Sequence, residues 1–270
     1  MKLYKTDYST ISDADRNVLE DLQAKEIIYH DGKPTSIRKS LYRDYPKSAR
    51  HFMSLFPNNF IDATDLTKSS EQLKTTLTQF EDLLNNTATT ERDLLNFIRD
   101  NEAYFIIGSL LKNNYTFGHH ALFVFPEFKM PPNYQADYLL AGKNSDGYHF
   151  VFVELENPYG DITLQDGTYG TTIRKGVKQI EDWEIWLEQN FSNIKLVFEG
   201  LQNKSEVLPK EFRDFDKTRI HYVVVAGRRN DYSDRTYRQR RNNLEQRKLL
   251  VAHYDNLIDY ANATIGTSTY

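Results

Sequence analysis

Acidic side chains near the middle of the chain have the types and spacing of a divalent-metal site. Two apolar runs, Ala136–Ala141 and Tyr148–Leu155, flank a cluster of turn-forming residues, which predicts a strand, a turn and a second strand. A loop at Asn144–Gly147 would place Asp137 opposite Glu154, with Cβ atoms about 5 Å apart. Two carboxylates that close repel by roughly 3 kcal/mol at an effective dielectric near 20. The pair therefore favours a bound cation, unless both side chains lie on a solvent-exposed face of the hairpin.

Further polar residues follow in an order that extends this site. Thr90 is the predicted N-cap of a helix from Glu91 to about Asn101, with Asp93 three residues on to complete a capping box. Glu91 is then either a site residue or an ordinary helix-dipole partner. Strand alternation puts Glu154 and Glu156 on one face of the sheet. Gln179 lies on the following predicted helix, which runs from Ile173 to about Gln189.

This order resembles the PD-(D/E)XK nuclease superfamily, in which a helical glutamate, an aspartate, a Glu-X-Lys motif and a helical glutamine build the active site. The segments ADYLL, VFVELENP, KQIEDW, VVVAGRR and HYDNLID are similar, more narrowly, to the carboxy-terminal domain of Shedu (SduA-type) proteins, a bacterial anti-phage defence family. The resemblance covers roughly residues 88–262. It implies a restriction-endonuclease-like core at 88–270, behind a small amino-terminal extension at 1–87.

The resemblance also implies roles for individual residues. Asp137, Glu154 and Glu156 would be the metal ligands for Mg²⁺ or Mn²⁺, and the same residues with Gln179, Glu91 and Lys175 would form the catalytic set. The partners implied are phage or other foreign DNA and further copies of the chain, as a dimer or tetramer. The activity implied is that of an endonuclease or nickase.

Glu156 departs from the family pattern, because it stands where the lysine of the motif is expected. Lys175, one helical turn before Gln179, can point an ammonium into the same site, whereas Lys178 faces elsewhere by about 100°. Alternatively, Glu156 is a third metal ligand. In a further alternative the site is inactive and the chain is a nucleic-acid-binding or sensing protein on the same fold, or an oligomeric interaction protein.

The charge of the chain is unevenly distributed. Residues 228–248 contain eight basic side chains against three acidic ones, a net charge of +5 within a chain of net charge −4, which leaves −9 elsewhere. The segment is predicted as a helix from Ser233 to Arg247, and it is either a phosphate-binding surface or a solvated helix face. The predicted nucleic-acid-binding residues are Arg228, Arg229, Arg235, Arg238 and Arg241.

Composition excludes several other classes of function. The chain has 270 residues, 39% of them hydrophobic, and no cysteine, which excludes disulfides, thiolate metal sites and cysteine nucleophiles. The amino end lacks the apolar run of a signal peptide, and no stretch of about 18 apolar residues is present. We therefore expect a cytoplasmic protein with no membrane partner. With no Walker loop or glycine triplet, we expect no nucleotide cofactor.

The elements that must position the site are predicted as an α/β fold, a mixed sheet with helices on both faces. Apolar runs predict strands at Ala121–Phe125, closed by Pro126, and at Ile194–Phe198. The sequence RIHYVVVA at 219–226 is apolar on both faces, as expected of a central strand. Other predicted elements are strands at Ile27–His30 and Leu249–Ala252, helices at 69–84 and 254–260, and a long loop at 157–172. Trp183 and Trp186 are interpreted as packing residues. A zinc site at His119-His120 is not favoured, because adjacent strand residues face opposite sides.

Overall fold

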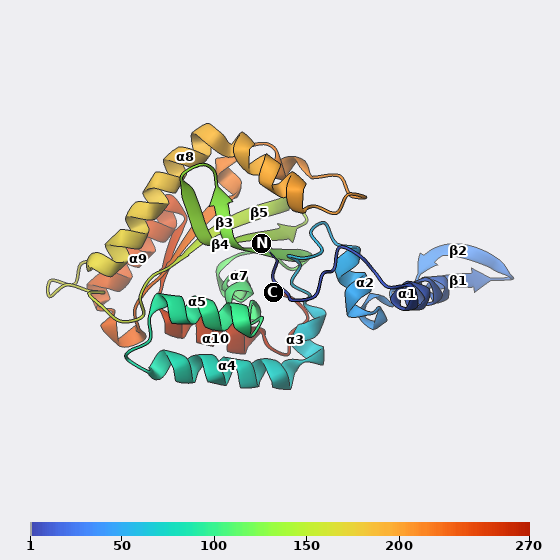
Figure 1. Cartoon of the computed structure of the whole chain (residues 1–270), viewed down its shortest axis with the longest axis horizontal. Helices are drawn as coiled ribbons and strands as arrows, with labels where there is room; N and C mark the ends of the chain where they lie inside the picture. The colour runs from blue at the N-terminus through green and yellow to red at the C-terminus, as the bar shows by residue number, and fades with distance from the viewer. Residues whose placement is uncertain (1) are drawn as a thin grey trace.

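A five-stranded mixed sheet forms the centre of the molecule (Figure 1). The computed structural model describes residues 2–270. The strands lie side by side in chain order: β3 (Ala121–Met130), β4 (Tyr134–Asn144), β5 (Gly147–Leu155), β6 (Ile220–Val225) and β7 (Leu249–Ala252). β3, β4 and β5 are antiparallel, whereas β5, β6 and β7 are parallel. The parallel pairs are joined through helices, as parallel strands require.

Helices cover both faces of the sheet, which confirms the predicted mixed α/β fold. One face carries α8 (Thr171–Leu201) and α9 (Asp234–Arg247), which follow β5 and β6 along the chain. The other face carries a bundle of shorter helices. These are α4 (Ser70–Asn85), α5 (Glu91–Asp100), α6 (Phe105–Gly108), α7 (Leu110–Asn114) and α10 (Tyr254–Thr264).

Strand alternation divides the interior into two hydrophobic cores. Val151, Val153 and Leu155 of β5 point toward the α5 and α10 side, whereas Phe150 and Phe152 point toward α8. Glu154 and Glu156 continue the row of side chains that faces α8, in place of apolar residues. At the end of β5, the central strand, the sheet therefore presents carboxylates to α8.

Two predicted elements are wrong. Ile194–Phe198 is not a strand but the last part of α8, which extends over 31 residues. Phe191, Ile194 and Phe198 are buried along one stripe of that helix, and a five-residue apolar run cannot be assigned to helix or strand by periodicity alone. Pro126 does not close its strand, since β3 continues to Met130. β3 is an edge strand, where a missing N–H is tolerated.

The amino-terminal region forms an arm that projects from the sheet (Figure 1). It consists of α1 (Asp13–Lys25), the hairpin of β1 (Ile27–His30) and β2 (Lys33–Arg38), and α2 (Lys47–Phe52). The next helix, α3 (Thr64–Lys68), lies beside α4, and its Leu66 belongs to the core of the helical bundle. β1 confirms the predicted strand. α4 packs into the same core as α5, because Leu77, Phe80 and Leu84 belong to one cluster with Leu94. Within residues 2–270 no helix combines the length and hydropathy needed to cross a membrane.

Candidate active site

The hairpin of β4 and β5 brings the two predicted carboxylates together. Its register pairs Lys143 with Tyr148 and Tyr138 with Val153, which is the register predicted from the turn. One step beyond the last pair, Asp137 lies opposite Glu154 on the face that α8 covers. Oδ2 of Asp137 accepts a hydrogen bond of 2.7 Å from the backbone N–H of Leu155. The side chain of Asp137 thus accepts the hydrogen bond that a backbone carbonyl of β4 would otherwise accept at the end of β5.

Glu156 is held just past the end of β5 by its own backbone. Its N–H donates to the carbonyl of Val225 at 2.8 Å, and its carbonyl accepts a hydrogen bond of 2.7 Å from the hydroxyl of Tyr254. Both neighbouring elements therefore fix the direction of the side chain. Asn157 follows, and its Oδ1 accepts a 3.0 Å hydrogen bond from the backbone N–H of Glu91. This contact ties the start of α5 to the end of the central strand.

The two glutamates are buried with incomplete hydrogen bonding. Glu154 is 6% exposed and Glu156 is 1% exposed. Oε2 of Glu154 and Oε1 of Glu156 have no hydrogen-bond partner among the groups in residues 2–270. An ionised carboxylate without a partner is costly to bury. These two oxygens must therefore be protonated or meet a cation.

Burial and mutual repulsion raise the pKa values within the acidic cluster. Burial raises the pKa of Glu154, and the charges of Asp137, Glu156 and Glu91 raise it further. Burial also raises the pKa of Asp137, with further increases from Glu91 and Glu156, although the N–H of Leu155 opposes the rise. Glu91 itself is half-buried at the first position of α5, where a capping box from Thr90 and Asp93 confirms the predicted helix start.

Lys175 of α8 points to this cluster. Its Nζ donates to Oε2 of Glu156 at 2.8 Å, while the lysine side chain remains 63% exposed. Burial raises the pKa of Glu156, and Lys175 offsets part of that rise. Gly176 makes the approach possible, because a Cβ there would lie 2.7 Å from Val224 and 3.2 Å from Cγ of Glu156. Gln179 lies one turn further along α8 and is half-buried.

The oxygen donors suit a hard divalent cation, but no ready-made metal cage is present in residues 2–270. No three His, Asp or Glu side chains in this range are grouped closely enough to hold one ion. Two candidate donor oxygens are already used, since Leu155 binds one oxygen of Asp137 and Lys175 binds one of Glu156. The unpartnered oxygens of Glu154 and Glu156 have the chemistry that Mg²⁺ prefers.

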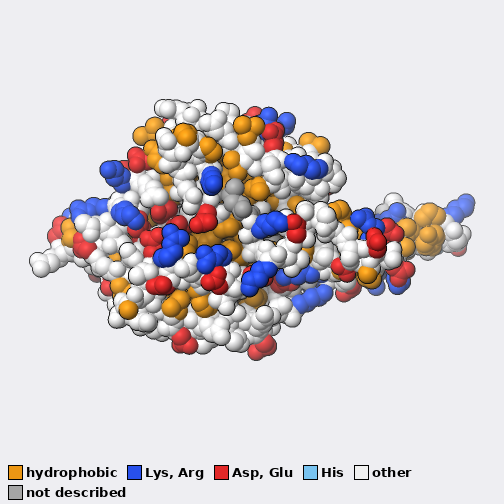
Figure 2. Space-filling view, in the orientation of Figure 1, with side chains coloured by type: hydrophobic (Ala, Val, Ile, Leu, Met, Phe, Trp, Pro, Cys, Tyr) orange, Lys and Arg blue, Asp and Glu red, His pale blue; other side chains and the backbone are white. Residues whose placement is uncertain are grey.

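A cleft of about 320 Å³ opens beside Asp137, between α5 and the β3–β4 hairpin. Lysine and arginine side chains lie beside acidic ones on this face of the molecule (Figure 2). Apolar side chains, including Leu95 and Pro126, form part of the cleft wall. Its basic lining residues are Lys2, Arg92, Arg99 and Lys129.

Sequence reasoning did not assign these basic residues to a site. The available signal was that Arg92 directly follows Glu91 and that Arg99 lies seven residues, or about two turns, beyond Arg92 on the same helix. Arg92 forms no ion pair with a carboxylate of residues 2–270, and its charge lowers the pKa of Asp137. Lys2 pairs with Asp7 and Arg99 with Asp100, and Glu127 also lines the cleft. Arg92 and Lys129 are therefore the basic side chains of the lining that remain available beside the acidic cluster.

The predicted nucleic-acid-binding arginines lie elsewhere, around the start of α9. Arg228 is engaged inside the fold, with hydrogen bonds of 2.9 Å to Asp255 and 2.8 Å to the hydroxyl of Tyr159. Arg229 pairs with Asp259 at 2.5 Å. Arg235 donates to the carbonyl of Asp166 at 2.9 Å. Arg238 and Arg241 are exposed on α9.

The two tryptophans of α8 are packing residues, as predicted. Trp183 is fully buried and Trp186 is nearly so, and both belong to the core between α8 and the sheet. The loop at 157–172 is irregular up to the start of α8, also as predicted. Tyr159 of this loop does not project freely, because its hydroxyl donates to the carbonyl of Leu84 at 2.6 Å.

Comparison with known proteins identifies a family for this arrangement. A family model described as Shedu protein SduA, C-terminal, matches residues 88–258. The match includes α5, the whole five-stranded sheet and the first part of α10, and hence all residues of the acidic cluster. The comparison with curated proteins finds no match.

Proposed function

Since the chain belongs to the Shedu SduA family of anti-phage defence proteins, we propose that it is a metal-dependent nuclease that hydrolyses phosphodiester bonds of phage or other foreign DNA. The observation that supports this proposal is the convergence of buried carboxylates with Lys175 beside a basic cleft. Asp137, Glu154 and Glu156 come from the end of one hairpin, and Glu91 from the helix that borders the cleft.

In this proposal Asp137 and Glu154 hold Mg²⁺ or Mn²⁺, with Glu91 and Glu156 completing the shell directly or through water. When bound, such an ion would supply Lewis-acid stabilisation to the phosphate. Two buried oxygens without partners, one on each glutamate, favour this assignment. The cation would relieve the repulsion that raises the pKa values of the cluster.

The remaining roles belong to side chains at the mouth of the site. The exposed ammonium of Lys175 would offset charge on the phosphate and orient the attacking water, with Glu156 fixing its direction. Gln179 would donate a hydrogen bond to a phosphate oxygen or to that water. Arg92 and Lys129 would hold the DNA backbone along the cleft, and such contacts position a strand without reading its sequence.

The decisive experiment measures cleavage of supercoiled plasmid with and without Mg²⁺ or Mn²⁺. Asp137→Ala should abolish metal-dependent nicking while the thermal unfolding transition is retained. Asp82→Ala, which removes an exposed carboxylate on α4, is the matched control and should cleave like the wild type. Undiminished cleavage by Asp137→Ala would remove the nuclease assignment from this site.

A second function is favoured by the Lys175–Glu156 ion pair. The glutamate at the motif's lysine position is neutralised within the protein, and two carboxylate oxygens of the cluster are already hydrogen-bonded. Such a site fits a DNA-binding or DNA-sensing protein without catalysis. A titration with both metals separates the two functions: salt-sensitive binding without cleavage at any metal concentration would establish the second.

A further inference from the structure

A second cavity, of about 200 Å³, lies on the opposite end of β3 from the basic cleft. Three parts of the chain that are far apart in sequence form it. The amino-terminal region contributes Tyr42 and Arg43 together with residues 60–67, the start of β3 contributes residues 118–122, and the carboxyl end contributes Ser268 and Tyr270. Nothing in the proposed nuclease chemistry uses this cavity.

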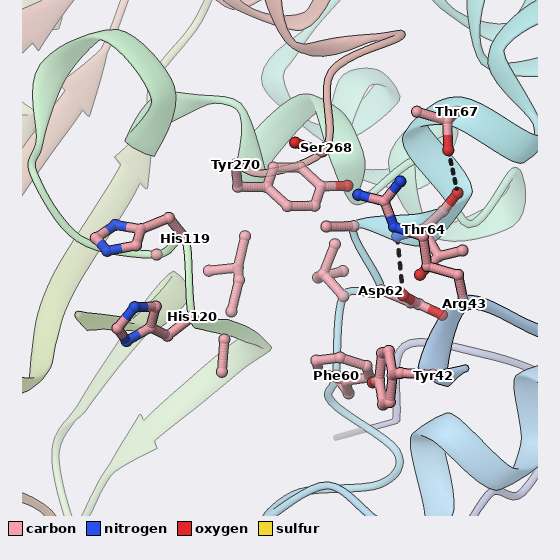
Figure 3. A pocket seen from close by; sticks show the side chains of 15 residues that line it. Tyr42, Arg43, Phe60, Asp62, Thr64, Thr67, His119, His120, Ser268 and Tyr270 are labelled. Carbon is pink, nitrogen blue, oxygen red and sulfur yellow. Dashed lines mark hydrogen bonds between the residues drawn. The ribbon is translucent and has the colours of Figure 1, made fainter. Parts of the chain in front are cut away.

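Figure 3 shows His119 and His120 on one side of this cavity and Arg43 on the other. The two imidazoles, with ring centroids 4.4 Å apart, are directed away from Arg43. The apolar side chains of Ile61 and Leu122 also line the cavity. The space thus offers a guanidinium on one side and an apolar surface beside it.

The cavity lining has one cationic side chain without an ion pair. Asp62 is the only Asp or Glu side chain on the lining. Its charge is taken up by the buried Arg50, at 2.5 Å, while its second oxygen accepts a hydrogen bond from the backbone N–H of Thr64 at 2.9 Å. Arg43 forms no ion pair with any carboxylate in residues 2–270. A guanidinium that faces a partly enclosed polar space is a typical partner for phosphate and carboxylate groups.

The walls are preformed. Gly266 donates its N–H to the carbonyl of Leu66 at 2.8 Å, and Lys112 donates to the carbonyl of Thr269 at 3.0 Å, so the carboxyl-terminal segment is fixed at two points. The ring of Tyr270 is 5% exposed and packs beside Gly108, where an added Cβ would approach it to 3.1 Å. Preformed cavities of mixed character are the usual form of small-molecule sites.

We propose that this cavity binds a small organic anion, a phosphate monoester or carboxylate with a short apolar body. The anionic group would bind Arg43, and the apolar body would lie on Ile61 and Leu122. The volume is below the range of about 300–1,000 Å³ found for drug-sized ligands, so the ligand is smaller than these. A bound ligand would join the amino-terminal region to the edge strand that also lines the DNA cleft.

Three probes separate the features of this ligand. Phenyl phosphate carries both the anion and the apolar body, inorganic phosphate carries only the anion, and phenol only the body. Binding is measured by titration calorimetry and by thermal unfolding of the full chain without DNA. Phenyl phosphate should bind more tightly than either of the other probes. At about 100 times its Kd it should raise Tm by roughly 5–10 °C.

Arg43→Ala should weaken the binding of phenyl phosphate at least tenfold. Arg213→Ala, which removes an exposed arginine outside the cavity, is the matched control and should leave the affinity unchanged. Absence of saturable binding by phenyl phosphate, or equal affinity in Arg43→Ala and wild type, would overturn the proposal. Neither readout depends on nuclease activity, so the result is independent of the proposed function.

Discussion

Replacing Glu154 by Gln should make the metal-free protein more stable while it abolishes metal-dependent cleavage. The wild-type carboxyl is buried beside Asp137 and Glu156, and one of its oxygens has no partner. Two charges about 5 Å apart cost roughly 3 kcal/mol at an effective dielectric near 20. Part of this cost is avoided by protonation. We therefore expect a gain of about 1–3 kcal/mol at pH 8, or roughly 2–8 °C in Tm.

The gain should depend on pH with a defined sign. Folding raises the pKa values of both Glu154 and Asp137 above their unfolded values of about 4, so the folded chain binds more protons than the unfolded chain. Their contribution to stability is therefore complete at pH below about 4 and is lost as pH rises through the folded values. In Glu154→Gln one of these groups is gone. The variant should differ least from wild type near pH 5 and most near pH 8.

The assay is urea or thermal unfolding from pH 5 to pH 8 after treatment with a chelator, repeated in the presence of Mg²⁺. Mg²⁺ should stabilise the wild type more than Glu154→Gln, because the variant lacks one anionic donor. Glu245→Gln, an exposed position on α9, is the control and should show the wild-type pH dependence. A variant that is less stable than wild type at pH 8 would contradict the electrostatic account of the cluster.

Three further perturbations test the surroundings of the site. The double variant Arg92→Glu/Lys129→Glu should weaken binding of duplex DNA. The slope of log K against log salt concentration should fall in magnitude by about 0.9 for each lost phosphate contact. Arg238→Glu, measured in the same salt titration, should have less effect, because the cleft is proposed to hold the DNA. Gly176→Ala should destabilise the fold by about 1–3 kcal/mol, because the added Cβ would lie 2.7 Å from Val224 of β6. This cost should exceed the gain from the better helix propensity of alanine. A chemical denaturation midpoint at or above that of wild type would refute the packing argument. Lys175→Met should reduce cleavage by about 10²–10³-fold with little change in DNA affinity, and a fall in affinity alone would show that the lysine only binds.

The sequence predicted those parts of the site that depend on local rules. The turn at Asn144–Gly147 fixed the hairpin register, and strand alternation then placed Asp137, Glu154 and Glu156 on one face. The capping box likewise located the start of α5 at Glu91. Local rules failed where an apolar run was consistent with two periods, as in the last two turns of α8. There the segment is helical because its apolar side chains are buried against the sheet, and a short stretch of sequence does not contain that information.

The basic cleft could not be predicted in this way, because its residues are related only through packing. Arg92 and Lys129 are 37 positions apart, and they line one cleft because α5 packs beside the edge of the hairpin. The positive segment around α9, by contrast, is conspicuous in the sequence but is partly paired within the fold, with Arg228 bound to Asp255. A run of like charges therefore identifies a basic region but does not show whether its charges are available to a ligand.

The inverted charge at Glu156 has a structural compensation that involves both sequence and packing. A lysine after β5 would have placed its ammonium in the cluster from the sheet; here Lys175 brings an ammonium to the same carboxylates from α8. This exchange requires a helix that approaches the strand end closely, and Gly176, the residue next to the lysine, provides that approach. Exchanging the charges in Glu156→Lys/Lys175→Glu should therefore retain more cleavage than either single substitution. If both single variants were as active as the double variant, the pair would have no catalytic role.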